Sequence, residues 1–148
     1  MSNGKLPISV HILTYNSAET VERTLQSVKD CAEILVVDGG SRDGTLEIAE
    51  KYDARIVKQD PDYPEGRPIQ DFAFVRNNAL GEAEQPWILS LDSDEYASEE
   101  LMAELRSVVN SDPAAYYVPR KYVLPNGKVV EHATTYPNKR LYFFHYDV

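Results

Sequence analysis

Short apolar runs alternate with helical periodicity over the first two-thirds of the chain. The runs are rich in Val, Ile and Leu, as expected for buried strands, and they fall at 8–13, 33–37, 54–57 and 87–91. Apolar residues at helical spacing mark the segments that follow these runs, at 21–28, 45–52, 72–79 and 98–110. Strands separated by single helices indicate right-handed βαβ crossovers. The pattern therefore predicts a three-layer, Rossmann-like α/β domain with a mainly parallel sheet, and Ser17 is the expected N-cap of its first helix.

Beyond Pro113 the pattern changes to short aromatic segments. Residues 125–127 (Pro-Asn-Gly) are typical of a hairpin turn between the strand-like segments 122–124 and 129–130. Residues 140–145 form a last strand candidate. We therefore expect this part of the chain to add an antiparallel β-hairpin region at one side of the sheet.

Composition excludes some classes of function. The 148 residues amount to one domain, and the formal net charge of −9 argues against a nucleic-acid partner, which needs clustered Lys and Arg. Cys31 is the only cysteine, so no intrachain disulfide forms, a packed thiol is expected, and the cytoplasm is the expected compartment. Neither a signal peptide nor a bilayer-spanning run is visible, although peripheral membrane association is compatible with the sequence.

The most informative polar residues directly follow the apolar run at 87–91. Asp92 and Asp94 flank Ser93 at the expected carboxyl end of a buried strand, where ligands of open α/β sheets bind. Two carboxylates at this spacing suit Mg²⁺ or Mn²⁺, ions whose coordination is usually completed by substrate phosphates. A solvated turn is the alternative on spacing alone. The buried strand before the pair favours a metal site and a nucleotide-diphosphate substrate.

Two further loops leave the ends of the first and second predicted strands. Thr14, Tyr15 and Asn16 lie in the first, and the second runs from Asp38 through the glycine-rich segment 39–44. The carboxyl ends of parallel strands meet at one edge of a sheet. We therefore expect all three loops to line a single crevice.

Residue types in these loops suit different parts of a nucleotide. The ring of Tyr15 suits stacking on a base, and Asp38 suits a base N–H or a ribose hydroxyl. Glycine permits positive φ and close approach of the backbone, so the loop around Gly40 suits backbone N–H contacts to a phosphate. Turn chemistry is the alternative for Asp38 and is the favoured interpretation of Asp43.

Two basic residues within predicted elements each have two interpretations. Arg76 lies on a helix whose other face is apolar, and it is either a solvated charge or, through its planar fork, a ligand of the diphosphate. His11 lies inside the first strand, and we expect it in the core or on a sheet face rather than as a ligand.

The order of these segments resembles family 2 glycosyltransferases of the GT-A fold. The branch that the chain is most similar to is the bacterial lipopolysaccharide-core glucosyltransferase type, whose Tyr-Val-Pro-Arg and Tyr-Pro-x-x-Arg-Leu segments have counterparts here. The blocks that carry the resemblance lie at 8–16, 34–45, 72–80, 92–94, 117–120 and 136–141.

The resemblance implies transfer of a sugar from a nucleotide-sugar donor, most simply a UDP-sugar, with inversion and with Mg²⁺ or Mn²⁺. By the same resemblance Tyr15 and Asp38 contact the nucleoside, Asp92 holds ribose or the donor sugar, and Asp94 binds the metal. Arg76 adds charge stabilisation at the departing diphosphate. The implied acceptor is a cell-surface glycan or a lipid-linked molecule, as in lipopolysaccharide biosynthesis.

Inverting transfer also needs a carboxylate base near the acceptor hydroxyl. Where the related branch often has Asp, this chain has Asn138, so Glu131 and Glu95 are the named candidates. We expect a single domain in which residues 1–112 bind the nucleotide sugar and residues 113–148 form an acceptor-side β part that is shorter than in the family.

Two rival functions stay open at this point. A non-catalytic nucleotide-sugar-binding module, or a fragment whose partner supplies the base, is favoured by the short chain and by Asn138. A nucleotidyltransferase shares the sheet and the acidic metal site. That class usually has a glycine-rich, basic loop after the first strand, and the loop at 14–17 lacks that character.

Overall fold

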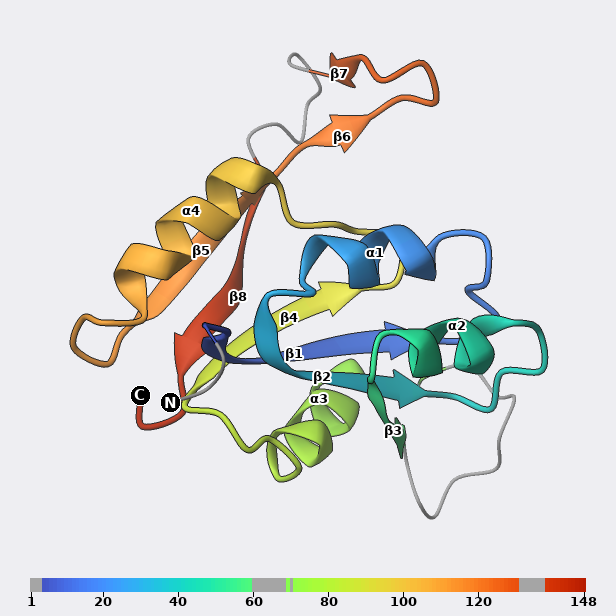
Figure 1. Ribbon diagram of the computed structural model, residues 1–148, viewed down its shortest axis with the longest axis horizontal. Coiled ribbons are helices and arrows are strands. Elements are labelled where there is room, and N and C mark those ends of the chain that lie inside the picture. The colour runs from blue at the N-terminus through green and yellow to red at the C-terminus, as the bar shows by residue number, and fades with distance from the viewer. Residues whose placement is uncertain (1–3, 60–68, 70, 131–137) are drawn as a thin grey trace.

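The computed structural model describes residues 4–59, 69, 71–130 and 138–148 and shows a layered α/β fold (Figure 1). Its main sheet has six strands in the order β3-β2-β1-β4-β8-β5. The elements are β1 Leu6–Thr14, α1 Val21–Ser27, β2 Cys31–Asp38, α2 Thr45–Lys51, β3 Arg55–Lys58, α3 Phe72–Leu80, β4 Trp87–Asp92, α4 Glu99–Val108, β5 Ala115–Arg120, β6 Tyr122–Val123, β7 Val129–Val130 and β8 Asn138–His145.

The sheet is mixed, with a parallel part and an antiparallel edge. Strands β3, β2, β1 and β4 run parallel, whereas β8 is antiparallel to β4 and β5 is antiparallel to β8. The predicted hairpin is present as β6 and β7, which form a separate two-stranded sheet. The predicted fold class is therefore confirmed, with β5 and β8 supplying the antiparallel strands beside β4.

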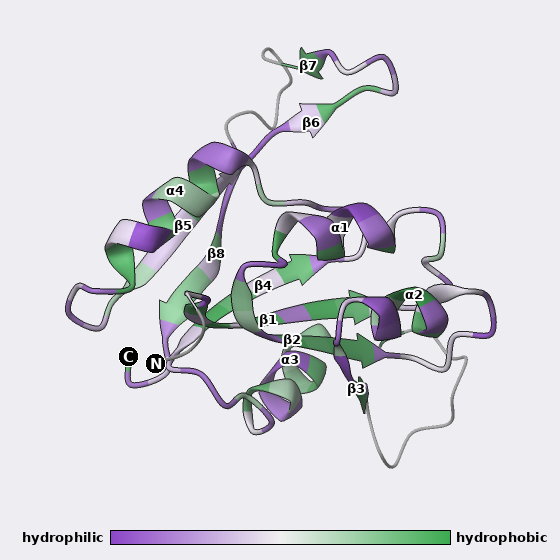
Figure 2. Ribbon diagram, in the orientation of Figure 1, coloured by the Kyte–Doolittle hydropathy of each residue, from purple (hydrophilic) through white to green (hydrophobic). Residues whose placement is uncertain are grey.

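Helices cover the two faces of the sheet unequally. Ile8, Val10 and Ile12 of β1 are fully buried in a large core with apolar residues of α1, α2 and α4. On the opposite face Leu13 belongs to a smaller cluster with Val75 of α3. Figure 2 shows long hydrophobic stretches in the central strands β1 and β2. Each fully buried aliphatic side chain contributes roughly 2 kcal/mol, so the larger face supplies most of the hydrophobic stabilisation.

Local details confirm one expectation and correct another. Cys31 is buried, and burial raises the pKa of its thiol to about 12. Because the thiolate is the reactive form, this cysteine is a packed, unreactive side chain, as expected. Ser17 is not the helix cap that the sequence predicted, because α1 begins at Val21 with Thr20 as its N-cap. A turn at 17–20 precedes the helix, and the Ser17 hydroxyl bonds to Ser93 instead. Within the described ranges, no helix combines the length and the apolar character needed to cross a bilayer.

Candidate functional site

Three adjacent strands end side by side. Thr14 pairs with Asp38 across β1 and β2, and Leu13 pairs with Asp92 across β1 and β4. Strand order reverses between β1 and β4, since β2 and β3 lie on one side and β4 on the other. A reversal of this kind leaves a crevice at the carboxyl ends of the strands. The three loops that the sequence predicted to meet therefore leave the same edge of the sheet.

Asp38 is buried and closes its own turn. Its Oδ2 accepts hydrogen bonds from Gly40 N at 2.8 Å and Ser41 N at 2.7 Å, while its Oδ1 accepts from Thr14 Oγ1 at 2.7 Å and Ser41 Oγ at 2.6 Å. Gly40 has φ 97°, which glycine adopts without strain. The Gly40 N–H is thus directed at Asp38 rather than outward, and the turn interpretation describes Asp38 in this structure.

Hydrogen bonds between side chains and backbone join the first loop to the second. Asn16 N donates to Ser41 Oγ at 2.8 Å, and Asn16 Oδ1 accepts from Arg42 N at 2.9 Å. Asp43 accepts from Ala18 N at 3.1 Å, and the hydrogen bond from the Thr45 hydroxyl to Asp43 is the main cause that lowers the pKa of Asp43. The expected turn role of Asp43 is therefore observed, with the addition of a bond that crosses between loops.

Tyr15 stands apart from this network. The residue is 49% exposed, and the described residues offer its ring no stacking partner and its hydroxyl no hydrogen bond. The neighbouring Asn16 has φ 47°, a left-handed conformation that asparagine tolerates. An aromatic ring left free at this edge of the sheet is available to a planar ligand.

The loop after β4 is anchored to the first loop and to α1. Ser17 Oγ lies 2.9 Å from Ser93 Oγ, and Thr24 Oγ1 donates to Ser93 O at 3.0 Å. Thr24 is fully buried and also contacts the backbone oxygen of Glu95. These contacts fix the middle of the Asp92–Asp94 segment and leave its two aspartates to face other partners.

The two aspartates differ in environment. Arg76 Nη2 lies 3.3 Å from Asp92 Oδ1, and both side chains are 34% exposed. Asp94 is exposed, and its carboxylate has no hydrogen bond or ion pair with the described part of the chain. No group of three or more potential metal ligands is found among the described residues. The two carboxylates supply oxygen ligands only, so a divalent cation held there would need its other ligands from a substrate, the coordination that Mg²⁺ and Mn²⁺ favour.

The candidates for a general base are placed differently. Glu131 lies outside the described residues. Asn138 heads β8 and pairs with Arg120 of β5, and its amide cannot take a proton. Glu95 accepts hydrogen bonds or ion pairs at both carboxylate oxygens, from Asp92 N and from two side chains of the C-terminal strands. Glu95 therefore presents no free oxygen for proton abstraction in this arrangement.

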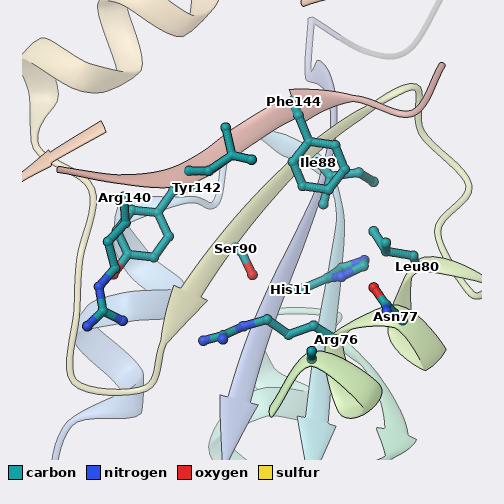
Figure 3. Close-up of a pocket in the computed structure, with 11 residues that line it drawn as sticks. His11, Arg76, Asn77, Leu80, Ile88, Ser90, Arg140, Tyr142 and Phe144 are labelled. Atoms are coloured by element: carbon teal, nitrogen blue, oxygen red, sulfur yellow. The ribbon is translucent and has the colours of Figure 1, made fainter. Parts of the chain in front are cut away.

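A cavity of ≈ 460 Å³ adjoins the Arg76–Asp92 pair (Figure 3). His11 and Ser90 line it from the sheet, and Arg76 reaches across it from α3. His11 is 2% exposed, its Nε2 has no hydrogen-bond partner among the described residues, and burial lowers its pKa to about 4. The expected sheet-face position of His11 is observed. The imidazole is neutral near pH 7.

Gln59 is a residue whose role sequence reasoning missed. Its Nε2 donates to Thr14 O at 3.0 Å and to Val37 O at 3.3 Å, which bridges the ends of β1 and β2. A Cβ on Gly39 would lie 2.7 Å from Gln59 Oε1, so a larger residue there would force the Gln59 side chain to shift. In the sequence Gln59 is marked only by its position just after the third predicted strand. That position does not predict a contact with Thr14, 45 residues earlier in the chain.

Known proteins resemble this chain over most of its length. Residues 9–147 match the model of a family described as Glycosyl transferase family 2. Among curated proteins, the lipopolysaccharide core biosynthesis glycosyltransferase LpsC of Rhizobium meliloti (strain 1021) is 31% identical over 140 residues, which cover 93% of this chain and 51% of LpsC. This chain therefore spans about half the length of that relative.

Solved structures of S. aureus TarS show the same fold. The structure of TarS 1–349 aligns with 93% of this chain and 46% of its own, with a TM-score of 0.58 and 24% identity. TarS 1–349 in complex with UDP-GlcNAc aligns with 68% of this chain and 30% of its own, with a TM-score of 0.53 and 31% identity. The alignment thus extends over nearly all of the α/β architecture described above.

Proposed function

The chain belongs to the Glycosyl transferase family 2, and from this premise we propose that it transfers a sugar from a nucleotide-diphosphate sugar to an acceptor hydroxyl. The observation that carries the proposal is the meeting of three strand ends at one edge of the sheet, with a free Asp94 carboxylate next to the Arg76–Asp92 pair. The match to the family model over residues 9–147 confirms the resemblance that the sequence blocks indicated. The nucleotidyltransferase alternative is set aside.

A UDP-sugar is the proposed donor class. The TarS structure that shares 31% identity with this chain is a complex with UDP-GlcNAc. We place the base against the exposed ring of Tyr15 and the nucleoside beside Asp38. All four hydrogen bonds to Asp38 come from within the protein. An N–H of the base would therefore share an Asp38 oxygen with a Ser41 donor, or would displace that donor. Thr14 is buried behind Asp38 and holds that carboxylate in place.

The diphosphate belongs at the Asp92–Asp94 segment in this proposal. Asp94, with Asp92, would hold Mg²⁺ or Mn²⁺, which would neutralise charge on the departing diphosphate. Arg76 is 3.3 Å from Asp92 and reaches the same space with a planar fork suited to phosphate oxygens. Asp92 would then be shared between this arginine, the cation and a ribose or sugar hydroxyl.

The acceptor side is proposed for residues 113–148, with residues 1–112 as the donor part. The likeness to an enzyme of lipopolysaccharide core biosynthesis leads us to propose a cell-surface glycan or a lipid-linked acceptor. Inverting transfer needs a base on the far side of the sugar from the diphosphate, and Glu131 is the candidate we retain.

Calorimetry of UDP binding tests the donor site. We expect wild-type protein to bind UDP with Mn²⁺ and to lose about tenfold or more in affinity when the metal is chelated or when Asp94→Asn removes the free carboxylate. Asp112→Asn, which neutralises an exposed aspartate before β5, is the matched control and should bind as wild type. Equal UDP affinity with and without metal in the wild-type protein would overturn the proposal.

A non-catalytic nucleotide-sugar-binding module is the second candidate. The observation that favours it is Asn138, whose amide stands at the head of β8 where the related branch often has a carboxylate. Release of UDP from UDP-sugars, measured with and without Glu131→Gln, separates the two. Binding without any turnover supports the module, and turnover that Glu131→Gln abolishes supports the enzyme.

A further inference from the structure

The segment with the two aspartates is tied to the C-terminal strands through one side chain. Glu95 Oε1 accepts a hydrogen bond from Asp92 N at 2.8 Å. Glu95 Oε2 accepts from Tyr142 Oη of β8 at 3.1 Å and lies 2.9 Å from Arg120 Nε of β5. One carboxylate therefore bridges the end of β4 to both strands of the antiparallel edge.

The bridge lies in a protected environment. The side chains of Arg120 and Glu95 are 22% and 15% exposed, and Tyr142 is buried in the large core. Burial, together with the charge of Glu95, raises the pKa of Tyr142 to about 12, so its hydroxyl keeps the proton that it donates. Charge-assisted hydrogen bonds shielded from water are stronger than exposed ion pairs. The bridge is thus a firm link rather than a solvated surface contact.

Each oxygen of Glu95 has a separate task. Oε1 holds the backbone of Asp92, the residue whose carboxylate meets Arg76. Oε2 contacts Tyr142 of β8 and Arg120 of β5, two strands that lie later in the chain. The ladder between β4 and β8 pairs residues 87–89 of β4, so beyond it a shift of β8 or β5 would reach the backbone of Asp92 through this carboxylate.

We propose that Glu95 is a positioning residue that sets the geometry of the Asp92–Asp94 segment against β5 and β8, and so couples the donor side of the crevice to the acceptor side. This inference rests on the proposed function, because it takes the segment to be the site of the diphosphate and its cation. It assigns Glu95 no proton transfer. The residue acts on the ligand only through Asp92 and its neighbours.

The test combines ligand binding with amide hydrogen exchange. Glu95→Ala removes the whole bridge, Glu95→Gln keeps an acceptor for Asp92 N, and Tyr142→Phe removes only the hydroxyl while keeping the ring. Tyr116→Phe is the matched control, since Tyr116 lies on the same sheet edge and its hydroxyl has no hydrogen-bond partner among the described residues. UDP affinity with Mn²⁺ is measured well below the melting temperature, and exchange is followed at residues 92–95.

Glu95→Ala should weaken Mn²⁺-dependent UDP binding about tenfold. Tyr142→Phe and Glu95→Gln should each weaken it about threefold. Exchange at the Asp92 amide should accelerate in the same order, while Tyr116→Phe changes neither quantity. A fall in melting temperature with unchanged UDP affinity and unchanged exchange at 92–95 would overturn the proposal, because Glu95 would then be merely structural. If Glu95→Ala does not fold, Tyr142→Phe decides by the same two readouts.

Failure of the proposed function has a different signature. Wild-type protein that binds no UDP with Mn²⁺ refutes the donor site, and exchange at 92–95 then decides alone whether Glu95 positions the segment. Faster exchange in Glu95→Ala and Tyr142→Phe than in Tyr116→Phe supports the positioning role even so. Equal exchange in all three variants refutes it.

Discussion

Thr14 and Asp38, which end adjacent strands, are joined by a hydrogen bond of 2.7 Å from the threonine hydroxyl to the carboxylate. The same carboxylate accepts two backbone N–H groups of the following loop. The bond therefore locks the loop that leaves β2 to the end of β1, and the position of the whole glycine-rich loop depends on this buried aspartate.

Substitutions at Asp38 should destabilise the protein in a graded way. Asp38→Asn keeps one oxygen that accepts from the two backbone N–H groups. Its NH₂ group would face the hydroxyls of Thr14 and Ser41, which can rotate to accept a hydrogen bond. We therefore expect a loss of about 1 kcal/mol in the free energy of unfolding. Asp38→Ala leaves the backbone donors unpaired and should cost about 3 kcal/mol. Urea denaturation measures both. Asp53→Asn, at an exposed left-handed turn position with φ 56°, should change stability by less than about 0.5 kcal/mol.

Arg76→Lys should lower the affinity for UDP while leaving the stability of the protein nearly unchanged. The Arg76–Asp92 pair is one-third exposed, so its loss should change the unfolding free energy by less than about 1 kcal/mol. A lysine cannot reproduce the planar fork, and under the proposed function UDP affinity with Mn²⁺ should fall about tenfold. Arg106→Lys, in the surface pair with Asp30, is the control for charge-preserving replacement. Wild-type affinity in Arg76→Lys would contradict a contact with the diphosphate.

Gly39→Ala tests the contact between Gly39 and Gln59. The added Cβ would lie 2.7 Å from Gln59 Oε1, and the Gln59 amide is held by two backbone oxygens. We expect a loss of about 1–3 kcal/mol, measured by thermal or urea unfolding. Gly81→Ala adds a Cβ at an ordinary 3.5 Å from the nearest atom and should be neutral or slightly stabilising. Equal stability of the two variants would show that Gln59 moves aside freely.

His11 should make the protein acid-sensitive. Burial lowers its pKa from 6.5 to about 4, so between these values the unfolded chain binds a proton that the folded chain does not. The stabilising contribution is complete above pH 6.5 and is lost as the pH falls toward 4, by an amount on the order of 3 kcal/mol. Urea denaturation of wild type and His11→Gln across this range measures it. The difference in stability between the two proteins should narrow or reverse as the pH falls, and parallel curves would refute the assignment.

The order and type of the elements followed from sequence because apolar periodicity is a local property. The strand runs at 8–13 and 87–91 became β1 and β4, with bounds that moved by at most two residues. The hairpin turn at 125–127 was predicted for the same reason, since its residue types specify the turn. Ser17 was assigned wrongly because capping depends on where the helix begins, and a preceding turn delayed that point to Val21.

The loop residues Tyr15, Asp38 and Asp94 were named from sequence because they follow predicted parallel strands, whose carboxyl ends meet at one edge of the sheet where ligands bind. Their partners were not predictable. Gln59 lies 45 residues from the Thr14 oxygen that it contacts, and Tyr142 lies 47 residues from Glu95. No spacing rule links such pairs, since their separation reflects the path of the chain through the sheet.

By itself, the sequence determined the fold class, the family and the set of polar residues at the ends of the strands, because these depend on local pattern and residue chemistry. Only the tertiary structure decided which of those residues are free. It shows that Asp38 is bound internally while Asp94 and Tyr15 are left exposed, and that Glu95 links the end of β4 to β5 and β8. The physical reason is that a hydrogen bond is short, so whether a polar group is satisfied depends on positions to within a few tenths of an ångström, which local pattern does not specify.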